Sequence, residues 1–592
     1  MVLGVRNMLF SAMSGFLDTG GFVKNEIGDC TFYHKGLFYL RGEKAGSASI
    51  AAFAEEYERS GVLPFEKAFG AFSCVVVRRT GETIFFTDNS NLHCFYVGSS
   101  AISDSFLSLV RHERASAFDE DALCEFLGLG GVFFGKTLVD SISTSASDCV
   151  YVCYGGTIRQ ELKQIGDIDE PSTVTDFAEF FQDTAHALSG ERVALSLTGG
   201  YDSRLVFACL RERLPVDVFI SCSDEKDPDV LWAKRVAQAG GATLEIVNVD
   251  KPVVNERYVR HLFVDADGVV PCVDDTYMRI HSFMHDRQDK GYTCLLTGDG
   301  GPRHKDWYWL QDFPFYRMRH TNLGRFYDQR LLVIPASIPI GGRIEKRYQG
   351  MRRRVVRGMR RYLQALNTES YDSLGFHVLG DIVKPLYTAH SRLVTSYAPL
   401  WELELVRYSF HLPRRERFFY NSMRKVTTAQ SKSIARTPTV YGTTASSERR
   451  YLARDVFFQG VDYTRKAARL LGRNVLHRNL FVGHPSGWSA EREVRGLKIT
   501  EQAVMYCERE GFVRAGTTAA DLSYAALGRV VQVYLIAEAL SPSGDASPVN
   551  EAPRHAVSAL IDSGRRGGIA RAVPGLPECV NCVRPAWSAG RR

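Results

Sequence analysis

Residues 192–210, "RVALSLTGGYDSRLVFACL", decide the fold. An apolar strand at Val193–Leu197 is followed by two glycines and then by a segment of helical periodicity. Adjacent glycines allow the backbone to turn tightly and to approach a ligand closely. Asp202 and Ser203 stand at the start of the expected helix, where Ser203 can cap it and donate a hydrogen bond to phosphate. The segment predicts a strand–loop–helix unit that binds an anion.

The next hundred residues repeat the alternation of strand and helix. Strands are predicted in "VDVFISCS" (216–223), "TLEIVNV" (243–249) and "YTCLLTGDGG" (292–301). A helix is predicted in "DPDVLWAKRVAQAGG" (227–241), which has Asp-Pro at its start and two glycines at its end. This order predicts a parallel, doubly wound sheet, which binds ligands at the carboxyl ends of its strands.

The pattern of predicted secondary structure differs on either side of this region. Residues 71–88 and 148–162 each read as a β-hairpin, and 119–129 has helical spacing between them. Beyond about residue 305 the pattern is mostly helical. At 592 residues the chain is too long for one ordinary core. We therefore expect two domains, covering residues 1–170 and 175–592.

Composition is that of a globular protein, with 45% hydrophobic and 24% charged residues. The net charge of +6 does not by itself indicate nucleic acid. No apolar run is long enough for a membrane span, so no membrane partner is expected. The 13 cysteines lack a disulfide-framework spacing and suggest reduced thiols in the cytoplasm. Cys579 and Cys582 form a C-x-x-C pair without the second pair of a zinc site.

A second glycine loop competes for the nucleotide. Residues 130–137, "GGVFFGKT", have the P-loop spacing G-x-x-x-x-G-K-[ST]. A phosphate loop has to follow a strand and open a helix. This one follows an apparent helix, precedes a stretch rich in Ser and Thr, and carries bulky side chains inside. We interpret it as a turn in which Lys136 and Thr137 bind no nucleotide.

"SLTGGYDSRL" resembles the PP-loop, S-G-G-x-D-S, of ATP pyrophosphatases that adenylate a substrate. "LLTGDGG" and "TSYAPLWELELVRYSFHLP" are similar to the pyrophosphate-side loop and to the P-F-L-D stretch of asparagine synthetase-like proteins. Residues 68–97 and 135–142 resemble the glutaminase domain of that family. The resemblance covers most of residues 60–445. It implies an Ntn-hydrolase-like αββα sandwich followed by a doubly wound parallel α/β PP-loop domain with a helical carboxyl-terminal part.

Carried over by position, the resemblance implies ATP and Mg²⁺ as cofactors. Asp202 would hold Mg²⁺. Acids of the family's second loop fall at Pro302 and Arg303, so Asp299 would have to supply the second carboxylate. The residues expected to contact ATP and pyrophosphate are Leu197, Thr198, Gly199, Gly200, Asp202, Ser203, Ile220, Ser221, Thr297 and Gly298.

Two further departures concern catalysis. Family glutaminases use a cysteine directly after the initiator methionine, with its own α-amine as base, whereas Val2 has no nucleophile. The family's Arg-Asp-Gly stretch reads "TDNSNLH", so we expect a degenerate domain that does not hydrolyse glutamine. The family's lysine after the helical stretch falls near Pro438, which leaves Lys432 and Arg436 as candidate cations for the oxyanion.

The implied reaction adenylates a carboxylate, giving AMP and pyrophosphate, and transfers the acyl group to ammonia or an amine. A macrolactam or β-lactam-type cyclase, or a natural-product or polysaccharide amidotransferase, is one alternative, because such cyclases also have inert front domains. Thr395 and Tyr397 replace the family's glutamate and arginine, so the acceptor pocket differs. The basic stretch 343–366 leaves a PP-loop RNA-modifying enzyme open, although nucleic acid is not the expected partner. The altered positions leave a non-catalytic ATP-binding descendant as a third alternative. A homodimer is compatible with all of these.

Overall fold

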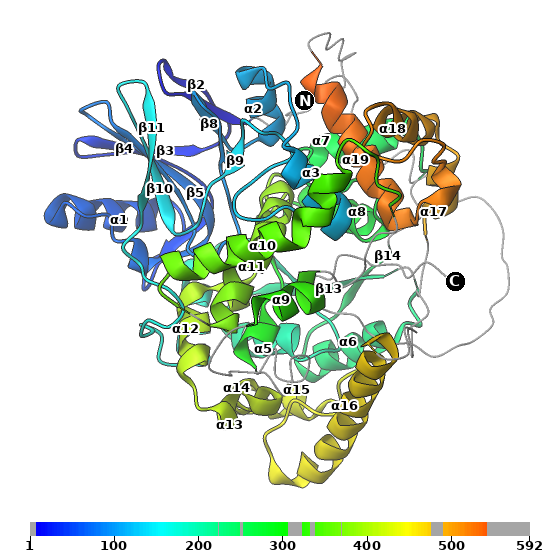
Figure 1. The fold of residues 1–592 in the computed structure, drawn as a ribbon. Helices are drawn as coiled ribbons and strands as arrows, with labels where there is room; N and C mark the ends of the chain where they lie inside the picture. The colour runs from blue at the N-terminus through cyan, green and yellow to red at the C-terminus, as the bar shows by residue number, and fades with distance from the viewer. Residues whose placement is uncertain are drawn as a thin grey trace.

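A computed structural model describes residues 7–222, 224–248, 253–305, 322–331, 338–368, 370–474 and 489–541. Within these ranges the chain forms two antiparallel sheets near the N-terminus, a parallel sheet in the middle and a largely helical second half (Figure 1). Val2 and the Cys579–Cys582 pair lie outside the described residues. No helix in the described ranges is long and apolar enough to cross a bilayer.

The amino-terminal part contains two antiparallel sheets packed face to face, with Phe10, Phe85 and Ile102 among the apolar side chains between them. In spatial order the first sheet has β2 (Gly15–Thr19), β1 (Met8–Ser11), β8 (Ala101–Ser103), β7 (Tyr96–Val97) and β9 (Ser143–Thr144). The second has β11 (Thr157–Leu162), β10 (Cys149–Tyr154), β6 (Thr83–Thr87), β5 (Ala68–Arg78), β4 (Cys30–Leu40) and β3 (Val23–Ile27). Both predicted hairpins are confirmed, as β5–β6 and β10–β11.

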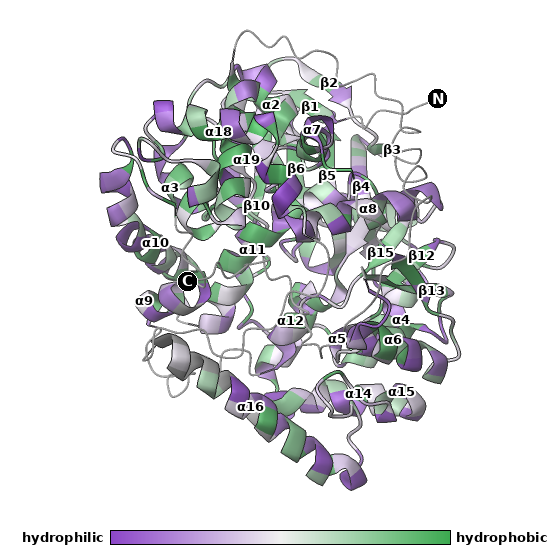
Figure 2. Cartoon of the chain, turned by 90° about the vertical axis from the view of Figure 1, so that its right-hand side faces the viewer, coloured by the Kyte–Doolittle hydropathy of each residue, from purple (hydrophilic) through white to green (hydrophobic). Residues whose placement is uncertain are grey.

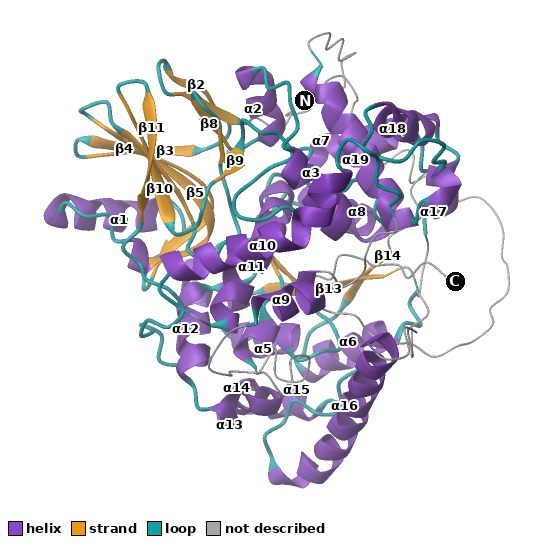
Figure 3. Cartoon of the chain, viewed as in Figure 1, coloured by secondary structure: helices purple, strands orange, loops and turns teal. Residues whose placement is uncertain are grey.

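Helices cover the outer faces of both sheets. Helix α1 (Ser47–Ser60) packs on the second sheet, where the Phe53 ring meets Phe38 and Phe86. Helices α2 (Phe106–Glu113) and α3 (Glu120–Leu129) lie on the side of the first sheet, and the Phe106 ring contacts Tyr96. The layers therefore run helix, sheet, sheet, helix (Figure 3), which confirms the predicted αββα sandwich.

The P-loop look-alike is a turn, as predicted. Gly130 ends α3 in the left-handed conformation, with φ of 80°. Lys136 pairs with Ser143 of β9 in an isolated β-bridge, so the chain continues into a strand and not into a helix. The Lys136 Nζ atom lies 3.0 Å from Oε1 of the buried Glu125. Lys136 thus neutralises a buried carboxylate of its own domain.

The central sheet is parallel throughout. Its spatial order is β14 (Glu245–Asn248), β13 (Val216–Cys222), β12 (Val193–Ser196), β15 (Cys294–Leu296) and β16 (Thr395–Tyr397). Its helices include α4 (Phe177–Ala187), α5 (Asp202–Leu210), α6 (Pro228–Ala239), α7 (Glu256–Asp265) and α8 (Asp275–Asp289). Leu195 packs with α4 and α5, whereas its neighbour Ala194 packs with Met284 of α8 on the opposite face. The sheet is therefore doubly wound, as the sequence predicts.

The second half is helical and includes one long apolar helix, α19 (Tyr524–Leu540). The remaining helices are α9 (Leu323–Phe326), α10 (Glu345–Ala365), α11 (Tyr371–His390), α12 (Leu403–His411), α13 (Arg414–Arg417), α14 (Asn421–Gln430), α15 (Lys432–Arg436), α16 (Leu452–Asn474), α17 (Glu491–Arg495), α18 (Lys498–Arg509) and α19 (Tyr524–Leu540). Helix α19 is largely hydrophobic and contacts α2, α3, α7 and α18 (Figure 2). It joins the sandwich to the helices around the parallel sheet.

The division into residues 1–170 and 175–592 stays a prediction. The chain passes from β11, which ends at Leu162, to α4, which begins at Phe177. The apolar core nevertheless crosses this division, because Phe69 of the sandwich packs on Phe180 of α4. The two parts are joined by shared packing.

A buried carboxyl also joins the two parts. Glu402 Oε1 accepts hydrogen bonds from the Gly70 N–H at 2.7 Å and from the Tyr397 hydroxyl at 2.8 Å. Its Oε2 accepts one from the Ser90 hydroxyl at 2.7 Å. Burial raises the pKa of Glu402 to about 8. The proton is therefore held more tightly in the folded chain than in the unfolded one.

This carboxyl predicts a pH dependence of stability. A raised folded-state pKa gives stability that is fully present below the unfolded-state pKa and is lost as pH rises towards about 8. Between about pH 4.5 and 8, Glu402 should lower the free energy of unfolding by up to about 1.4 kcal/mol per pH unit. Glu402→Gln removes the ionisation, so its free energy of unfolding, measured by denaturant titration, should fall less between pH 5 and pH 8. Parallel pH profiles for the variant and the natural protein would contradict this.

Candidate nucleotide and pyrophosphate site

The predicted PP-loop lies at the carboxyl end of β12. Residues 197–201 connect this strand to α5, which begins at Asp202. Strand β12 has β13 on one side and β15 on the other, because the chain runs from β12 to β13 and β14 on one side and then crosses to β15 on the other. Such a switch point at the carboxyl edge is where open α/β sheets bind ligands. The fold therefore puts the loop where a nucleotide is expected.

Hydrogen bonds inside the loop fix its shape. The Ser203 hydroxyl accepts from the Thr198 N–H at 3.0 Å and lies 3.0 Å from the Thr198 hydroxyl. The Gly199 N–H donates to Asp229 Oδ1 of α6 at 2.6 Å. A β-carbon at position 199 would lie 2.5 Å from a Val440 methyl and 2.8 Å from Trp232. Only glycine fits there, because three segments converge on this backbone.

A buried arginine ties the loop to a distant segment. Arg204 of α5 donates to the carbonyl of Gly199 at 3.2 Å and to that of Pro438 at 3.0 Å. It also donates to the carbonyls of Ile434 and Thr437. Pro438, near which the family's lysine is expected, therefore lies against the PP-loop.

Asp202 has the properties of a metal ligand. Its Oδ1 atom is buried and has no hydrogen-bond partner in the described part of the chain. Burial raises the pKa of Asp202 to about 7, nearby Lys305 opposes this rise and Asp299 adds to it. A β-carbon at position 301 would lie 2.0 Å from the Asp202 carboxyl carbon, so Gly301 leaves room for that carboxylate. An unsatisfied buried carboxylate oxygen is costly, and a hard cation such as Mg²⁺ would satisfy it.

Asp299, the other predicted metal ligand, is electrostatically coupled to Asp202. Burial raises the pKa of Asp299, and hydrogen bonds from Tyr387 and Thr297 oppose the rise. The Tyr387 hydroxyl donates to Asp299 Oδ2 at 2.6 Å. The structure thus brings together the two carboxylates that the sequence nominated. Their donor set fits Mg²⁺.

The predicted adenosine residues follow the ends of the same strands. Leu197 comes directly after β12, Ile220 and Ser221 lie in the last part of β13, and Thr297 and Gly298 follow β15. A β-carbon at position 298 would lie 2.4 Å from the Ser203 nitrogen, so the loop after β15 touches the start of α5. These positions share one edge of the sheet with Asp202.

Lys305 was not predicted from the sequence. The ammonium lies close enough to Asp202 to lower its pKa. Its Nζ atom donates to the Tyr420 hydroxyl and lies 4.3 Å from the centre of that ring. The Tyr420 ring stacks at 4.5 Å on Tyr201 of the PP-loop. Two tyrosines therefore hold a cation beside the loop.

The two cations nominated from the sequence lie elsewhere. Arg436 makes a bidentate ion pair with Glu448, with distances of 2.7 and 2.8 Å, and its side chain is 40% exposed. Lys432 begins α15 and is exposed. The structure gives neither side chain a hydrogen bond or ion pair with the PP-loop among the described residues. Their catalytic role stays a prediction.

Sequence reasoning also missed Arg204 and Asp229. Arg204 follows the motif directly, but its four carbonyl partners lie on the PP-loop and in residues 434–438. Asp229 stands in the first turn of α6, whose N-terminus was predicted. In the sequence, each of these two residues was a charged side chain next to a predicted element, and no partner or role had been assigned to it.

Fold and site together define a nucleotide-binding α/β domain with a PP-loop. Residues 178–437 match the family model described as asparagine synthase. This part of the chain contains the whole parallel sheet and both aspartates, and the match supports an asparagine synthetase-like family, whose members are ATP-dependent ligases and amidotransferases. A comparison with curated proteins finds no match.

Proposed function

We propose that the protein is an ATP-dependent ligase that adenylates a carboxylate and transfers the acyl group to ammonia or to an amine. The observation that carries this proposal is the buried Asp202 oxygen beside the PP-loop, which has no hydrogen-bond partner among the described residues, in a domain that matches the asparagine synthase family. A chain that had lost ATP chemistry would have no reason to keep an unsatisfied carboxylate there. This argues against a non-catalytic descendant.

The residues divide the adenylation step between them. A carboxylate oxygen of the substrate attacks the α-phosphorus of ATP, and pyrophosphate leaves with the β and γ phosphates. Mg²⁺, held by Asp202 and Asp299, would neutralise negative charge on the phosphates. Thr198, Gly200 and Ser203 would bind the departing pyrophosphate, with Lys305 as the nearby cation, whereas the Gly199 N–H is engaged by Asp229.

Acyl transfer completes the reaction. The amine nitrogen attacks the acyl carbon of the adenylate, AMP leaves with the bridging oxygen, and the nitrogen gives up a proton. Positive charge near the developing oxyanion accelerates this step. Arg436 and Lys432 are retained as candidates for the source of this positive charge. Lys305 is the alternative candidate, and its position near Asp202 supports it.

The basic helix does not favour an RNA substrate over a small one. Arg347 and Arg354 of α10 both pair with Asp121 of α3. Arg352 makes a bidentate pair with Asp328. These three arginines, of the nine Lys and Arg residues in 343–366, are thus matched by acids of the same chain.

The proposed function is tested by pyrophosphate release. The full chain is incubated with ATP and Mg²⁺ against a panel of amino acids and other carboxylic acids, each with ammonia or an amine. Release of pyrophosphate and AMP that depends on one class of carboxylate is expected. Carboxylate-dependent release of ADP and phosphate, or binding of ATP with no turnover on any member, would overturn the proposal.

Glutamine is not expected to serve as the nitrogen donor. Val2 supplies no nucleophile, so glutamate release from glutamine should not exceed that of an enzyme-free blank. Ammonia tested at the same carboxylate serves as the positive control. Glutamate release that persists after replacement of Cys30 and Cys222, the half-exposed cysteines among those described, would show an active glutaminase.

A further inference from the structure

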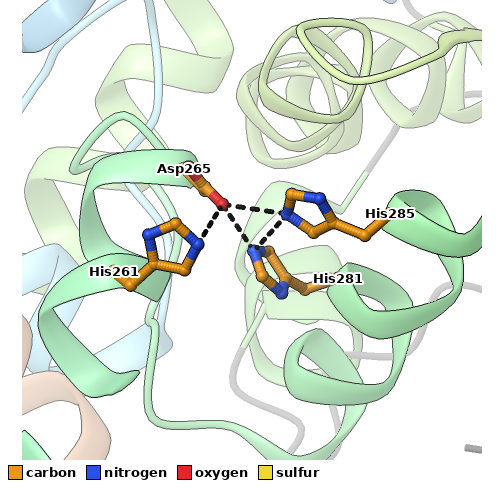
Figure 4. Close-up of side chains that lie close together, drawn as sticks. All are labelled: His261, Asp265, His281 and His285. Atoms are coloured by element: carbon orange, nitrogen blue, oxygen red, sulfur yellow. Dashed lines mark hydrogen bonds and ion pairs between the residues drawn. The ribbon is translucent and has the colours of Figure 1, made fainter. Parts of the chain in front are cut away.

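We propose that helices α7 and α8 bind a structural Zn²⁺ ion through His261, Asp265, His281 and His285. One ligand atom from each of these four side chains lies within 4.8 Å of all the others. The four side chains point towards one another from two neighbouring helices (Figure 4). The site is separate from the PP-loop and does not rest on the proposed function.

The sequence spacing places the ligands in pairs. His261 and Asp265 are four residues apart on α7, and His281 and His285 are four residues apart on α8. Residues at this spacing lie on one face of a helix, one turn apart. The two helices turn these faces towards each other, which brings together "HLFVD" (261–265) and "HSFMH" (281–285).

Four of the six distances between the ligand atoms are close to the edges of a metal coordination polyhedron, and the other two, from His261 to His281 and to His285, are within 4.8 Å. Asp265 Oδ2 lies 2.7 Å from His281 Nε2, 3.1 Å from His285 Nε2 and 3.3 Å from His261 Nε2. The Nε2 atoms of His281 and His285 are 3.1 Å apart. Zinc bonds of 2.0–2.1 Å in a tetrahedron separate neighbouring ligand atoms by about 3.3 Å. Small side-chain movements would complete that geometry.

Protons alone do not satisfy these contacts. If His281 and His285 both carry a proton on Nε2 to donate to Asp265, their two N–H groups face each other at 3.1 Å. If one gives up its proton to accept from the other, its lone pair faces the carboxylate oxygen. Each tautomer assignment leaves at least one repulsive contact. A cation at the centre turns every contact into a favourable one.

The donor set selects the metal. Three imidazole nitrogens and one carboxylate oxygen suit Zn²⁺ and disfavour Mg²⁺ and Ca²⁺, which prefer oxygen. Four protein ligands fill a tetrahedron, which is typical of structural zinc and leaves no open position for catalysis. The His281 side chain is 3% exposed and that of Asp265 13%, so the ion would be largely shielded from water.

The site would stabilise the contact between the two parts of the chain. Asp267, two residues beyond Asp265, accepts hydrogen bonds from the Ser105 hydroxyl at 2.7 Å and from the Phe106 N–H at 2.6 Å, at the start of α2. It also pairs with Arg392 at 2.8 Å. Fixing α7 to α8 fixes the loop that carries Asp267. Zinc would thus hold the sandwich against the parallel-sheet region.

The test measures zinc directly. Protein without a histidine tag is stripped with a chelator, retitrated with Zn²⁺ against a chromophoric competitor, and melted with and without the ion. One tight zinc per chain and a raised melting temperature are expected. The variant His261→Gln/His285→Gln, which changes the two most exposed histidines of the site, should bind zinc at least about 100-fold more weakly and lose the melting shift.

Three controls separate ligation from general effects. His411→Gln, at an exposed histidine of α12, should bind zinc as the natural chain does. Cys579→Ser/Cys582→Ser removes the other candidate ligands and should not change the count. His285→Cys supplies a thiolate ligand at position 285 and should retain zinc binding, whereas His261→Gln/His285→Gln should lose it. Equal zinc affinity in the natural chain and the double histidine variant, or loss of tight zinc on removing the two cysteines, would overturn the proposal.

Discussion

Asp202→Asn is expected to abolish pyrophosphate release, with a rate loss of about 10³-fold or more and little change in the fold. The asparagine keeps the size of the side chain but removes the negative charge that would bind Mg²⁺, a term worth several kcal/mol in the transition state. A loss of about 10³-fold corresponds to about 4 kcal/mol. Because the natural carboxylate is buried and its Oδ1 has no partner in the described chain, the neutral variant should fold at least as well. Steady-state pyrophosphate release and thermal melting measure the two effects.

The matched control is in the P-loop look-alike. Lys136→Arg destroys the P-loop consensus but keeps a cation beside the buried Glu125, so it should release pyrophosphate at the natural rate. Lys136→Ala is a poorer control, because it would leave a buried carboxylate unpaired. Inactive Lys136→Arg together with active Asp202→Asn would mean that the nucleotide binds at residues 130–137.

Lys305→Ala is expected to reduce the rate of adenylation by about 10²–10³-fold, which is the usual effect of removing one charged donor from a site of this kind. The Lys305 ammonium lies close enough to Asp202 to lower the pKa of that carboxyl, and it is held against Tyr420 of the stacked tyrosine pair. Lys305→Gln gives a matched neutral variant of similar length. Pre-steady-state release of pyrophosphate measures adenylation, and formation of AMP together with the amide measures acyl transfer.

Arg436→Ala decides whether Arg436 or Lys305 supplies the positive charge for the reaction. An exposed arginine paired with Glu448 contributes little, so both steps should stay within about threefold of the natural rate. If Arg436→Ala instead loses acyl transfer while adenylation proceeds, the assignment made from the sequence is restored. Natural adenylation in both Lys305 variants would remove Lys305 from the site.

The PP-loop and the parallel sheet could be predicted because their signals are local. A strand, two glycines and a capped helix occupy consecutive residues, and the Asp-Pro and Gly-Gly ends of α6 were readable in the same way. The P-loop look-alike at residues 130–137 could be rejected for the same reason, since it follows a helix and precedes a strand, whereas a phosphate loop follows a strand and precedes a helix. The prediction of the αββα sandwich depended on the family resemblance, because the sequence of an antiparallel strand does not indicate which strand it pairs with.

The remaining site residues depend on contacts that the sequence does not show. Tyr420 holds the side chain of Lys305 in place, and carbonyl groups more than 200 residues away along the chain hold that of Arg204. The nearest sequence cations, Lys432 and Arg436, were chosen by position along the chain, but a side chain's direction is set by tertiary packing. The histidines of α7 and α8 had helical spacing in the sequence. Their meeting requires the hairpin between the two helices.

The most direct test of the central claim uses a carboxylate substrate, found in the pyrophosphate assay, that carries ¹⁸O in both carboxyl oxygens. Adenylation joins one of these oxygens to the α-phosphorus, and acyl transfer leaves it there. Mass spectrometry should therefore find one ¹⁸O in the AMP and none in the pyrophosphate. Label in inorganic phosphate would show an acyl phosphate in place of an acyl-adenylate, and unlabelled AMP formed along with the amide would contradict the proposed reaction.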